Sequence, residues 1–330
     1  MTVATVPVKT GLSGEGSTLA RMLRAGKFAV CAEVSPPIGP NPEAVKKHID
    51  MLRGYADAFN VTDNQSAMVH MSSLSVSIML KQAGLEPVVQ FTCRDRNRLG
   101  LQADILGAAA FGIVNVLGLS GDHPIWGDHP QCKAVYDIDS MNLIRMMRMM
   151  RDNQVFENNR PIPKRAPDLF IGAVENPFAP PYEYRPLRLA KKIAAGAQFI
   201  QTQLIFNVDR FREFMHRVVD LGLHEKVYIL AGVGPIRSLK GAEYMAKEVA
   251  GMDVPDRILK RLEGLSKEDQ AKCGLDIACE IAEQVRAIEG VAGLHVMAVS
   301  WPEGVPMVVK QLGLYPRPVL ESAAVAVPAA

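Results

Sequence analysis

The chain has 330 residues, with 37 Lys and Arg against 35 Asp and Glu, a formal net charge of +2 and 48% apolar residues. This balance of charge excludes a disordered polyampholyte and a dedicated nucleic-acid binder, which carry a strong charge imbalance or concentrated basic stripes. No apolar run approaches the roughly 18 residues of a transmembrane helix, and no signal-peptide pattern opens the chain. Five scattered cysteines without a CxxC pair are typical of reduced thiols, so we expect a soluble cytoplasmic protein.

Apolar, β-branched runs alternate with longer amphipathic patterns along the chain, beginning at Phe28. The runs predict eight strands, at residues 28–34, 58–62, 87–92, 113–119, 168–174, 198–204, 226–233 and 294–299. Helices are predicted between them, for example at residues 42–54, 72–83, 96–111 and 185–195, each ending at or beside a glycine. Asn41 and Pro42 are typical helix-start residues for the first of these.

The order of these segments favours a (β/α)8 TIM barrel. The strands are almost continuously hydrophobic, as parallel strands covered by helices are, and eight strand-then-helix units suit a barrel. A doubly wound open sheet is the alternative. Residues 122–139 predict a long loop after the fourth strand, and residues 251–290 predict extra helix inserted before the last strand. We expect a single catalytic domain over residues 1–321 and a flexible C-terminal tail over residues 322–330.

The carboxyl ends of the strands are where barrel active sites lie, and this rule selects candidate residues from position alone. Glu33 lies near the end of the first strand among apolar neighbours. Partial desolvation there would raise its pKa towards that of a general acid, whereas a structural bond to the backbone or to an arginine is the alternative. Asp122 follows a Ser-Gly turn after the fourth strand, and either orients a ligand or caps the loop as an Asx turn.

The segment around Asp122 also contains residue types that bind metals. Two Asp-His-Pro sequences, at residues 122–124 and 128–130, are followed by Cys132. Their spacing matches no common zinc motif, and the prolines fit a rigid loop equally well. We therefore expect no metal at this position.

Amide side chains are frequent at the other strand ends: Asn64, Gln65, Gln90, Asn176 and Gln203. An apolar pocket with an amide-rich rim suits a flat heteroaromatic ligand such as a pterin or an isoalloxazine ring. No glycine-rich phosphate motif follows a strand. A nucleotide cofactor would therefore be bound by the loops at the barrel mouth.

Six segments, taken in order, resemble the methylenetetrahydrofolate reductase family. They are residues 32–37 (AEVSPP), 60–64 (NVTDN), 90–95 (QFTCRD), 119–122 (LSGD), 196–197 (GA) and 202–207 (TQLIFN). Their order and spacing resemble the family from Phe28 to Leu314. The resemblance implies a flavin-bearing (β/α)8 barrel of one-carbon metabolism, which interconverts 5,10-methylenetetrahydrofolate and 5-methyltetrahydrofolate by ping-pong hydride transfer.

The resemblance also implies roles for particular residues. Glu33 corresponds to the acid that helps to open the five-membered ring of the substrate, and Asp122 to the aspartate beside the pterin and the flavin. Gln203 corresponds to the glutamine that hydrogen-bonds the pterin. The implied cofactor-binding positions are Thr62, Gln90, Leu119, Ser120, Asn176 and Lys192, with Lys192 near the flavin phosphates. The implied cofactor is FAD, with FMN as the alternative, and the implied electron donor is NADH or NADPH.

Four positions depart from the well-studied bacterial members of the family. Ser120 replaces an arginine, Asn176 a tyrosine, Arg185 an acidic residue and Leu239 an aromatic one. The pattern is similar to a divergent branch of acetogens and other C1-metabolising bacteria, in which a partner subunit is an alternative source of electrons. Two other functions stay open: a flavin-free methyltetrahydrofolate-binding methyltransferase barrel, and a subunit of an electron-transfer complex. We expect a folate substrate and no nucleic-acid or membrane partner, with homo-oligomerisation left open.

Overall fold

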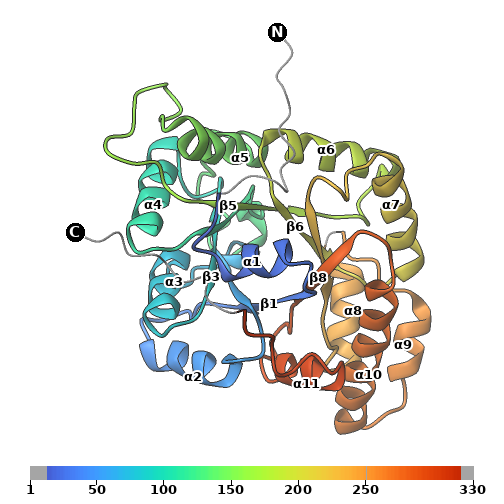
Figure 1. The fold of residues 1–330 in the computed structure, drawn as a ribbon. Helices are drawn as coiled ribbons and strands as arrows, with labels where there is room; N and C mark the ends of the chain where they lie inside the picture. The colour runs from blue at the N-terminus through green and yellow to red at the C-terminus, as the bar shows by residue number, and fades with distance from the viewer. Residues whose placement is uncertain (1–12, 250, 321–330) are drawn as a thin grey trace.

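The fold is a closed barrel of parallel strands, seen in a computed structural model that describes residues 13–249 and 251–320. Within these residues β1 to β8 follow one another around the barrel in sequence order, and helices surround them (Figure 1). The first strand pairs with both the second and the last, so the barrel prediction is confirmed and the open-sheet alternative is wrong. The tail predicted at residues 322–330 lies outside the described residues.

The strands lie close to their predicted positions. They are β1 (Ala29–Val34), β2 (Ala58–Val61), β3 (Pro87–Thr92), β4 (Asn115–Leu119), β5 (Phe170–Glu175), β6 (Phe199–Leu204), β7 (Tyr228–Val233) and β8 (Val291–Val296). The largest error is in the last strand, which begins and ends three residues before the predicted 294–299. Barrel closure decides its position, because Gly293 and Val296 pair with Ala29 and Ala32 of β1.

Helices cover the outside of the barrel, except the first, which lies across one end of it. They are α1 (Thr18–Arg24), α2 (Pro42–Leu52), α3 (Ser73–Gln82), α4 (Arg98–Ala110), α5 (Ser140–Arg148), α6 (Arg185–Ala195), α7 (Val208–Asp220), α8 (Leu239–Glu248), α9 (Asp256–Leu262), α10 (Lys267–Arg286) and α11 (Gly304–Gln311). The extra helix predicted before the last strand is confirmed by α9 and α10, which lie between α8 and β8. In the described residues no helix is both long and apolar enough to cross a membrane.

Local sequence signals explain where the helices begin and end. The Asn41 side chain accepts a hydrogen bond from the Ala44 N–H at the start of α2, and Val45, Ile49 and Leu52 recur on its buried face. Gly196 ends α6 with a φ of 129°. A Cβ atom there would also lie 2.7 Å from the Arg148 side chain, so glycine suits both the backbone and the packing.

Two apolar cores fix the orientation of the barrel. The larger lies between the strands and the outer helices. The smaller fills the amino-terminal part of the barrel interior, where Phe170 and Phe199 stack 5.0 Å apart and Leu19 and Leu23 of α1 pack against the strands. Figure 1 shows α1 lying across the barrel. Because apolar side chains fill this end, the candidate site is sought at the carboxyl ends of the strands.

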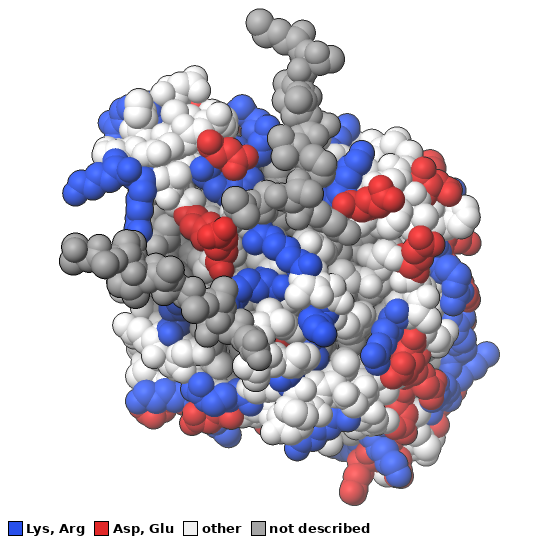
Figure 2. Space-filling model, viewed as in Figure 1, with Lys and Arg blue, Asp and Glu red and all other residues white. Residues whose placement is uncertain are grey.

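Charges of both signs are spread over the surface. Figure 2 shows Lys and Arg interspersed with Asp and Glu around the face that it displays. This distribution agrees with the near-zero net charge and gives that face no continuous basic stripe of the kind that binds nucleic acid.

Candidate active site

Several predicted site residues share the inner side of the barrel with the smaller core. Cys31 belongs to that core whereas Val30 and Ala32 belong to the outer one, so alternation along β1 turns Glu33 inward. The same alternation turns Gln90 inward beyond Val88 on β3. These side chains stand above the apolar filling, at the barrel mouth.

Glu33 is the most distinctive of them, because its carboxyl group is largely removed from water without a compensating ion pair. Its side chain is 24% exposed, and burial raises its pKa to about 7. The nearest basic group is Nε2 of His295 on β8, which is 3.9 Å from Glu33 Oε2. Burial lowers the pKa of His295 to about 3, so the imidazole is neutral near pH 7 and the pair carries no salt bridge.

A pair of amides forms the layer below Glu33. Asn60 on β2 and Gln201 on β6 are both buried and exchange hydrogen bonds across the barrel, one of which measures 2.9 Å from Gln201 Nε2 to Asn60 Oδ1. Buried amides that satisfy one another in this way form a rigid layer. Because their groups are engaged with each other, they support the site from below.

The residues expected at the cofactor differ in whether their side chains already form hydrogen bonds within the protein. Gln90 is 9% exposed, and its carboxamide has no hydrogen bond within the described residues. The Thr62 hydroxyl donates to Gln65 Oε1 at 2.8 Å, and Leu119 and Ser120 are half-buried at the end of β4. Gln90 therefore keeps free donors and acceptors at the mouth, as a ligand-binding amide must.

Asp122 joins two loops at the rim of the mouth. Its Oδ2 accepts a hydrogen bond from the Ser66 N–H at 3.1 Å, which ties the loop after β4 to the loop after β2. The side chain is exposed, so the carboxylate also faces solvent. The position serves a structural purpose and leaves the charge accessible to a ligand.

Arg94 lies between these loops as a buried guanidinium. It is 3% exposed and binds the Asp95 carboxylate at 2.6 and 2.7 Å through two nitrogens. It also donates to the carbonyl oxygens of Asn64, at 3.1 Å, and Asp122, at 3.3 Å. One charged side chain thus fixes the ends of β2, β3 and β4 relative to one another.

The backbone of the loop after β2 is strained. Asn64, Ser66 and Ala67 have φ angles of 48°, 56° and 56°, in the left-handed region that non-glycine residues rarely adopt. The loop after β4 packs so closely on it that a Cβ atom at Gly127 would lie 1.9 Å from the Ala67 carbonyl oxygen. The contacts of Arg94 and Asp122 with this loop offset the strain.

The predicted residues that follow β5 are engaged elsewhere. Lys192 on α6 is 4% exposed, and its ammonium binds the Glu175 carboxylate at 2.9 Å and the Val174 carbonyl oxygen. Burial lowers the pKa of Lys192, and the Glu175 charge opposes that change. Asn176 donates to the Gly251 carbonyl oxygen at 3.0 Å and accepts from the Phe178 N–H at 2.9 Å. The structure therefore sets these two apart from the open groups at the mouth.

Gln203 lies where β6 is irregular. The pairing register of β6 and β7 shifts between Gln201 and Leu204, and Gly232 leaves room for the displaced backbone, since a Cβ there would lie 2.6 Å from the Gln203 carbonyl oxygen. Gln203 Oε1 accepts a hydrogen bond from the Leu204 N–H at 2.9 Å, and the side chain is half-buried. Its amide nitrogen keeps its donors for a ligand.

The Asp-His-Pro segment holds loops together. Asp128 accepts a hydrogen bond from the Val69 N–H at 3.0 Å, and its other oxygen contacts His129 Nδ1 at 2.8 Å. Among the described residues no group of three or more His, Cys, Asp or Glu side chains is arranged to hold a metal ion.

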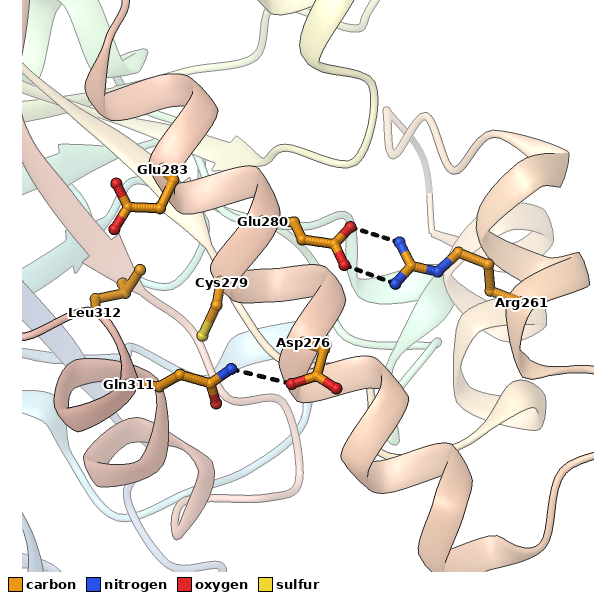
Figure 3. Close-up of a pocket in the computed structure, with 7 residues that line it drawn as sticks. All are labelled: Arg261, Asp276, Cys279, Glu280, Glu283, Gln311 and Leu312. Atoms are coloured by element: carbon orange, nitrogen blue, oxygen red, sulfur yellow. Dashed lines mark hydrogen bonds and ion pairs between the residues drawn. The ribbon is translucent and has the colours of Figure 1, made fainter.

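Two surface cavities lie outside the barrel interior. One, of about 810 Å³, follows β7 and β8 and is lined by Leu239 and Trp301 together with charged residues of α8 and α10. The other, of about 400 Å³, lies between α9, α10 and α11 (Figure 3). Most of its polar groups are paired: Glu280 binds Arg261 through both oxygens, and Asp276 accepts a hydrogen bond from Gln311. No predicted site residue lines that second cavity.

Sequence reasoning missed two residues of this site. His295 lies on a strand whose position was misjudged, although it is the one titratable side chain in the β8 sequence Val291–Val296. Arg94 was part of a recognised strand end, but nothing in the sequence showed that its guanidinium is buried between three loops.

Comparison with known proteins gives a consistent result. A family model described as methylenetetrahydrofolate reductase matches residues 18–313. A probable methylenetetrahydrofolate reductase (NADPH) of Caenorhabditis elegans is 24% identical over 254 residues, covering 76% of this chain and 36% of the relative. Methylenetetrahydrofolate reductase (NADH) 1 of Arabidopsis thaliana is 24% identical over 300 residues, covering 88% of this chain and 49% of the relative.

The chain thus spans between a third and a half of these eukaryotic relatives. The 5,10-methylenetetrahydrofolate reductase of Salmonella typhimurium is 24% identical over 298 residues, covering 88% of this chain and 93% of the relative. Among solved structures, an uncharacterized protein from Clostridium thermocellum, which binds two copies of 5-methyl-5,6,7,8-tetrahydrofolic acid, has a TM-score of 0.65 at 14% identity. The match covers 90% of this chain and 100% of the Clostridium thermocellum chain, so the two proteins share the fold.

Proposed function

Because the chain belongs to the methylenetetrahydrofolate reductase family, we propose that it interconverts 5,10-methylenetetrahydrofolate and 5-methyltetrahydrofolate, with Glu33 as the proton donor. The observation that carries this proposal is the Glu33 carboxyl group, which faces the barrel mouth with its pKa raised by burial to about 7. A carboxyl group with such a pKa holds a proton near pH 7 and can also release it. The relatives named for this reaction support the choice of substrate.

The proton transfer follows from the chemistry of the substrate. Opening the five-membered ring breaks one bond from the bridging carbon to nitrogen, and the departing nitrogen keeps the electron pair. Glu33 gives its proton to that nitrogen, while the other nitrogen and the carbon form an iminium cation that accepts hydride. In the opposite direction Glu33, as carboxylate, takes the proton back.

The other polar residues are proposed to orient the folate and stabilise its charge. The exposed Asp122 carboxylate lies at the rim, where a negative charge lowers the energy of the developing cation. The free amide nitrogen of Gln203 and the free carboxamide of Gln90 suit the alternating donors and acceptors of a pterin or flavin edge. The same residues bind in either direction of reaction.

A flavin fits one end of the site better than the other. Its ring system suits Gln90, Thr62, Leu119 and Ser120 at the mouth, and when bound it would supply the hydride. The phosphate end is less open, because Lys192 is already paired with Glu175 and Asn176 with Gly251. The residues at the mouth and the family support a flavin, and we propose FAD, or FMN with its shorter phosphate-bearing chain, as the cofactor. NADH or NADPH is the proposed electron donor, and an electron-delivering partner subunit is the alternative. We propose that the protein acts in the cytoplasm.

The engaged Lys192 also favours a second candidate, a flavin-free barrel that binds methyltetrahydrofolate and transfers its methyl group. One experiment separates the two. The purified protein is denatured to identify released cofactor by mass spectrometry, and is then supplied with methylenetetrahydrofolate and NADH, NADPH or a reduced viologen. We expect a flavin and the formation of 5-methyltetrahydrofolate. A colourless protein that cannot be reconstituted with flavin and forms no product would overturn the reductase assignment.

A further inference from the structure

His295 is a buried titratable residue to which the proposed reaction assigns no role. It is 3% exposed on β8, and its ring faces the interior of the barrel beside Glu33. Nδ1 is fully buried and has no hydrogen-bond partner within the described residues, and Nε2 is 3.9 Å from Glu33 Oε2. A polar atom left unpaired in this way is costly, so its presence at the mouth calls for a function.

The surroundings of the ring determine which nitrogen carries the proton. A neutral imidazole has one N–H and one lone pair. Nε2 faces a carboxyl oxygen, whereas Nδ1 faces no acceptor in the described part of the chain. The N–H is therefore favoured on Nε2, where it points at Glu33. At 3.9 Å the contact is too long for a hydrogen bond, but the N–H dipole still acts on the carboxylate through a medium of low dielectric constant.

Few other ionisable groups face this pair. On β1, β2, β7 and β8 the remaining titratable side chains are Cys31 and Tyr228, and burial raises the pKa of both. Both thus stay uncharged near pH 7, and Tyr228 lies at the opposite end of β7 from the mouth. The protonation of Glu33 therefore depends on desolvation and on the one polar ring beside it.

We propose that His295 is a positioning residue for Glu33, which keeps a neutral ring with its Nε2–H directed at the carboxyl group and thereby eases the release of the proton. This inference rests on the proposed role of Glu33. A charged histidine would hold Glu33 as a carboxylate and remove the acid, whereas an apolar residue would leave the carboxylate with no favourable dipole. A neutral ring lies between these extremes, so Glu33 can both donate and regain its proton.

The test measures the protonation of Glu33 in the protein without added folate or cofactor. Infrared spectra recorded over a range of pH follow the carboxyl stretching band of Glu33. This band is assigned as the one that is absent in Glu33→Gln. His295→Leu is expected to move the midpoint upwards by about one pH unit, because the carboxylate loses the N–H dipole. His295→Gln, which keeps a side-chain N–H, is expected to move it less. His216→Gln, a substitution of an exposed histidine on α7, is expected to leave it unchanged. An unchanged or lowered midpoint in His295→Leu would overturn the proposal.

A second measurement is made on the unsubstituted protein and needs a folded variant only to assign one signal. Nitrogen-15 spectra of the histidines, with the His295 signal assigned by its loss in His295→Gln, report the position of the ring proton. We expect a neutral ring with the proton on Nε2 from about pH 5 to about pH 8. A proton on Nδ1, or a ring that becomes charged within this pH range, would overturn the proposal. Neither measurement needs folate or cofactor, so absence of folate turnover would affect the proposed function alone.

Discussion

The two sides of the barrel mouth differ in how completely their polar groups are paired. Where the loops after β2 and β4 meet, Arg94, Asp95 and Asp122 form ion pairs and hydrogen bonds that fix a strained backbone. Where β1 and β8 meet, Glu33 and His295 lie 3.9 Å apart without forming an ion pair, and one ring nitrogen is unpaired. A fully paired group is held in one charge state, whereas a desolvated and unpaired carboxyl group can exchange its proton. The first side therefore suits support and the second suits chemistry.

The largest effect is expected from removing the acid on the unpaired side. Glu33→Gln keeps the shape of the side chain but holds no transferable proton, so we expect kcat/KM for folate turnover to fall by about 100-fold or more. Product formation measured by chromatography checks this. Glu43→Gln on α2, an exposed carboxylate paired only with Lys46, is the matched control and should retain full activity. Comparable activity in both variants would show that Glu33 is not the proton donor. The unpaired side of the mouth would then have no demonstrated part in catalysis.

A change on the paired side is expected to affect stability first. Arg94→Met removes hydrogen bonds to a carboxylate and to two loop carbonyl groups, and should lower the free energy of unfolding by about 2 kcal/mol. Urea denaturation measures it. Arg212→Met, which breaks an exposed pair with Asp209, should cost less than about 1 kcal/mol. Equal losses in the two variants would show that the buried guanidinium contributes no more than a surface ion pair.

Asp122 tests whether one residue can belong to both sides. Asp122→Asn keeps an oxygen that accepts the Ser66 N–H but removes the negative charge at the rim. We expect turnover to fall about tenfold, with an unchanged melting temperature. Asp128→Asn is the matched control, since Asp128 also accepts a backbone N–H from the loop after β2. If both variants are fully active, Asp122 is structural only and the paired side takes no part in catalysis.

The fold could be predicted from the sequence because each strand and helix carries its own periodic pattern and its own end signals. Helix α6, with Pro186 near its start and Gly196 after its end, was predicted over the residues that form it. The last strand was displaced because its first residues, Val291, Ala292 and Gly293, are mostly small and carry little strand signal. Their place is decided by pairing with β1, a contact between the two ends of the chain that no local pattern records.

The candidate site was predictable only where position along a strand determines the direction of a side chain. Glu33 and Gln90 follow from the alternation of a strand whose mouth end is known. Lys192 could not be judged in this way, because its helix position does not reveal that Glu175 binds its ammonium group. His295 is a lone histidine whose partner lies at the other end of the sequence. Pairing across the barrel, rather than residue type, separates the open groups from the engaged ones.

The smallest expected effect is on the pH dependence of stability, where Glu33 and His295 act in opposite directions. The folded pKa of Glu33, about 7, is above its ordinary value of 4.5, so its contribution to stability is full below pH 4.5 and is lost as the pH rises through 7. The folded pKa of His295, about 3, is below its ordinary value of 6.5, so its contribution is full above pH 6.5 and is lost as the pH falls through 3.

Between pH 4.5 and 6.5 the two contributions therefore oppose each other in the unsubstituted protein. Each single variant should therefore show the pH dependence of stability that the remaining residue contributes. Relative to the unsubstituted protein, Glu33→Gln should become more stable with rising pH in this interval, and His295→Gln less stable, each with a slope of about 1.4 kcal/mol per pH unit. Calorimetry at a series of pH values measures both slopes. Slopes near zero in both variants would mean that the carboxyl group and the imidazole are both charged in this interval, as in an ordinary ion pair, and the unpaired side would then be no different in kind from the paired one.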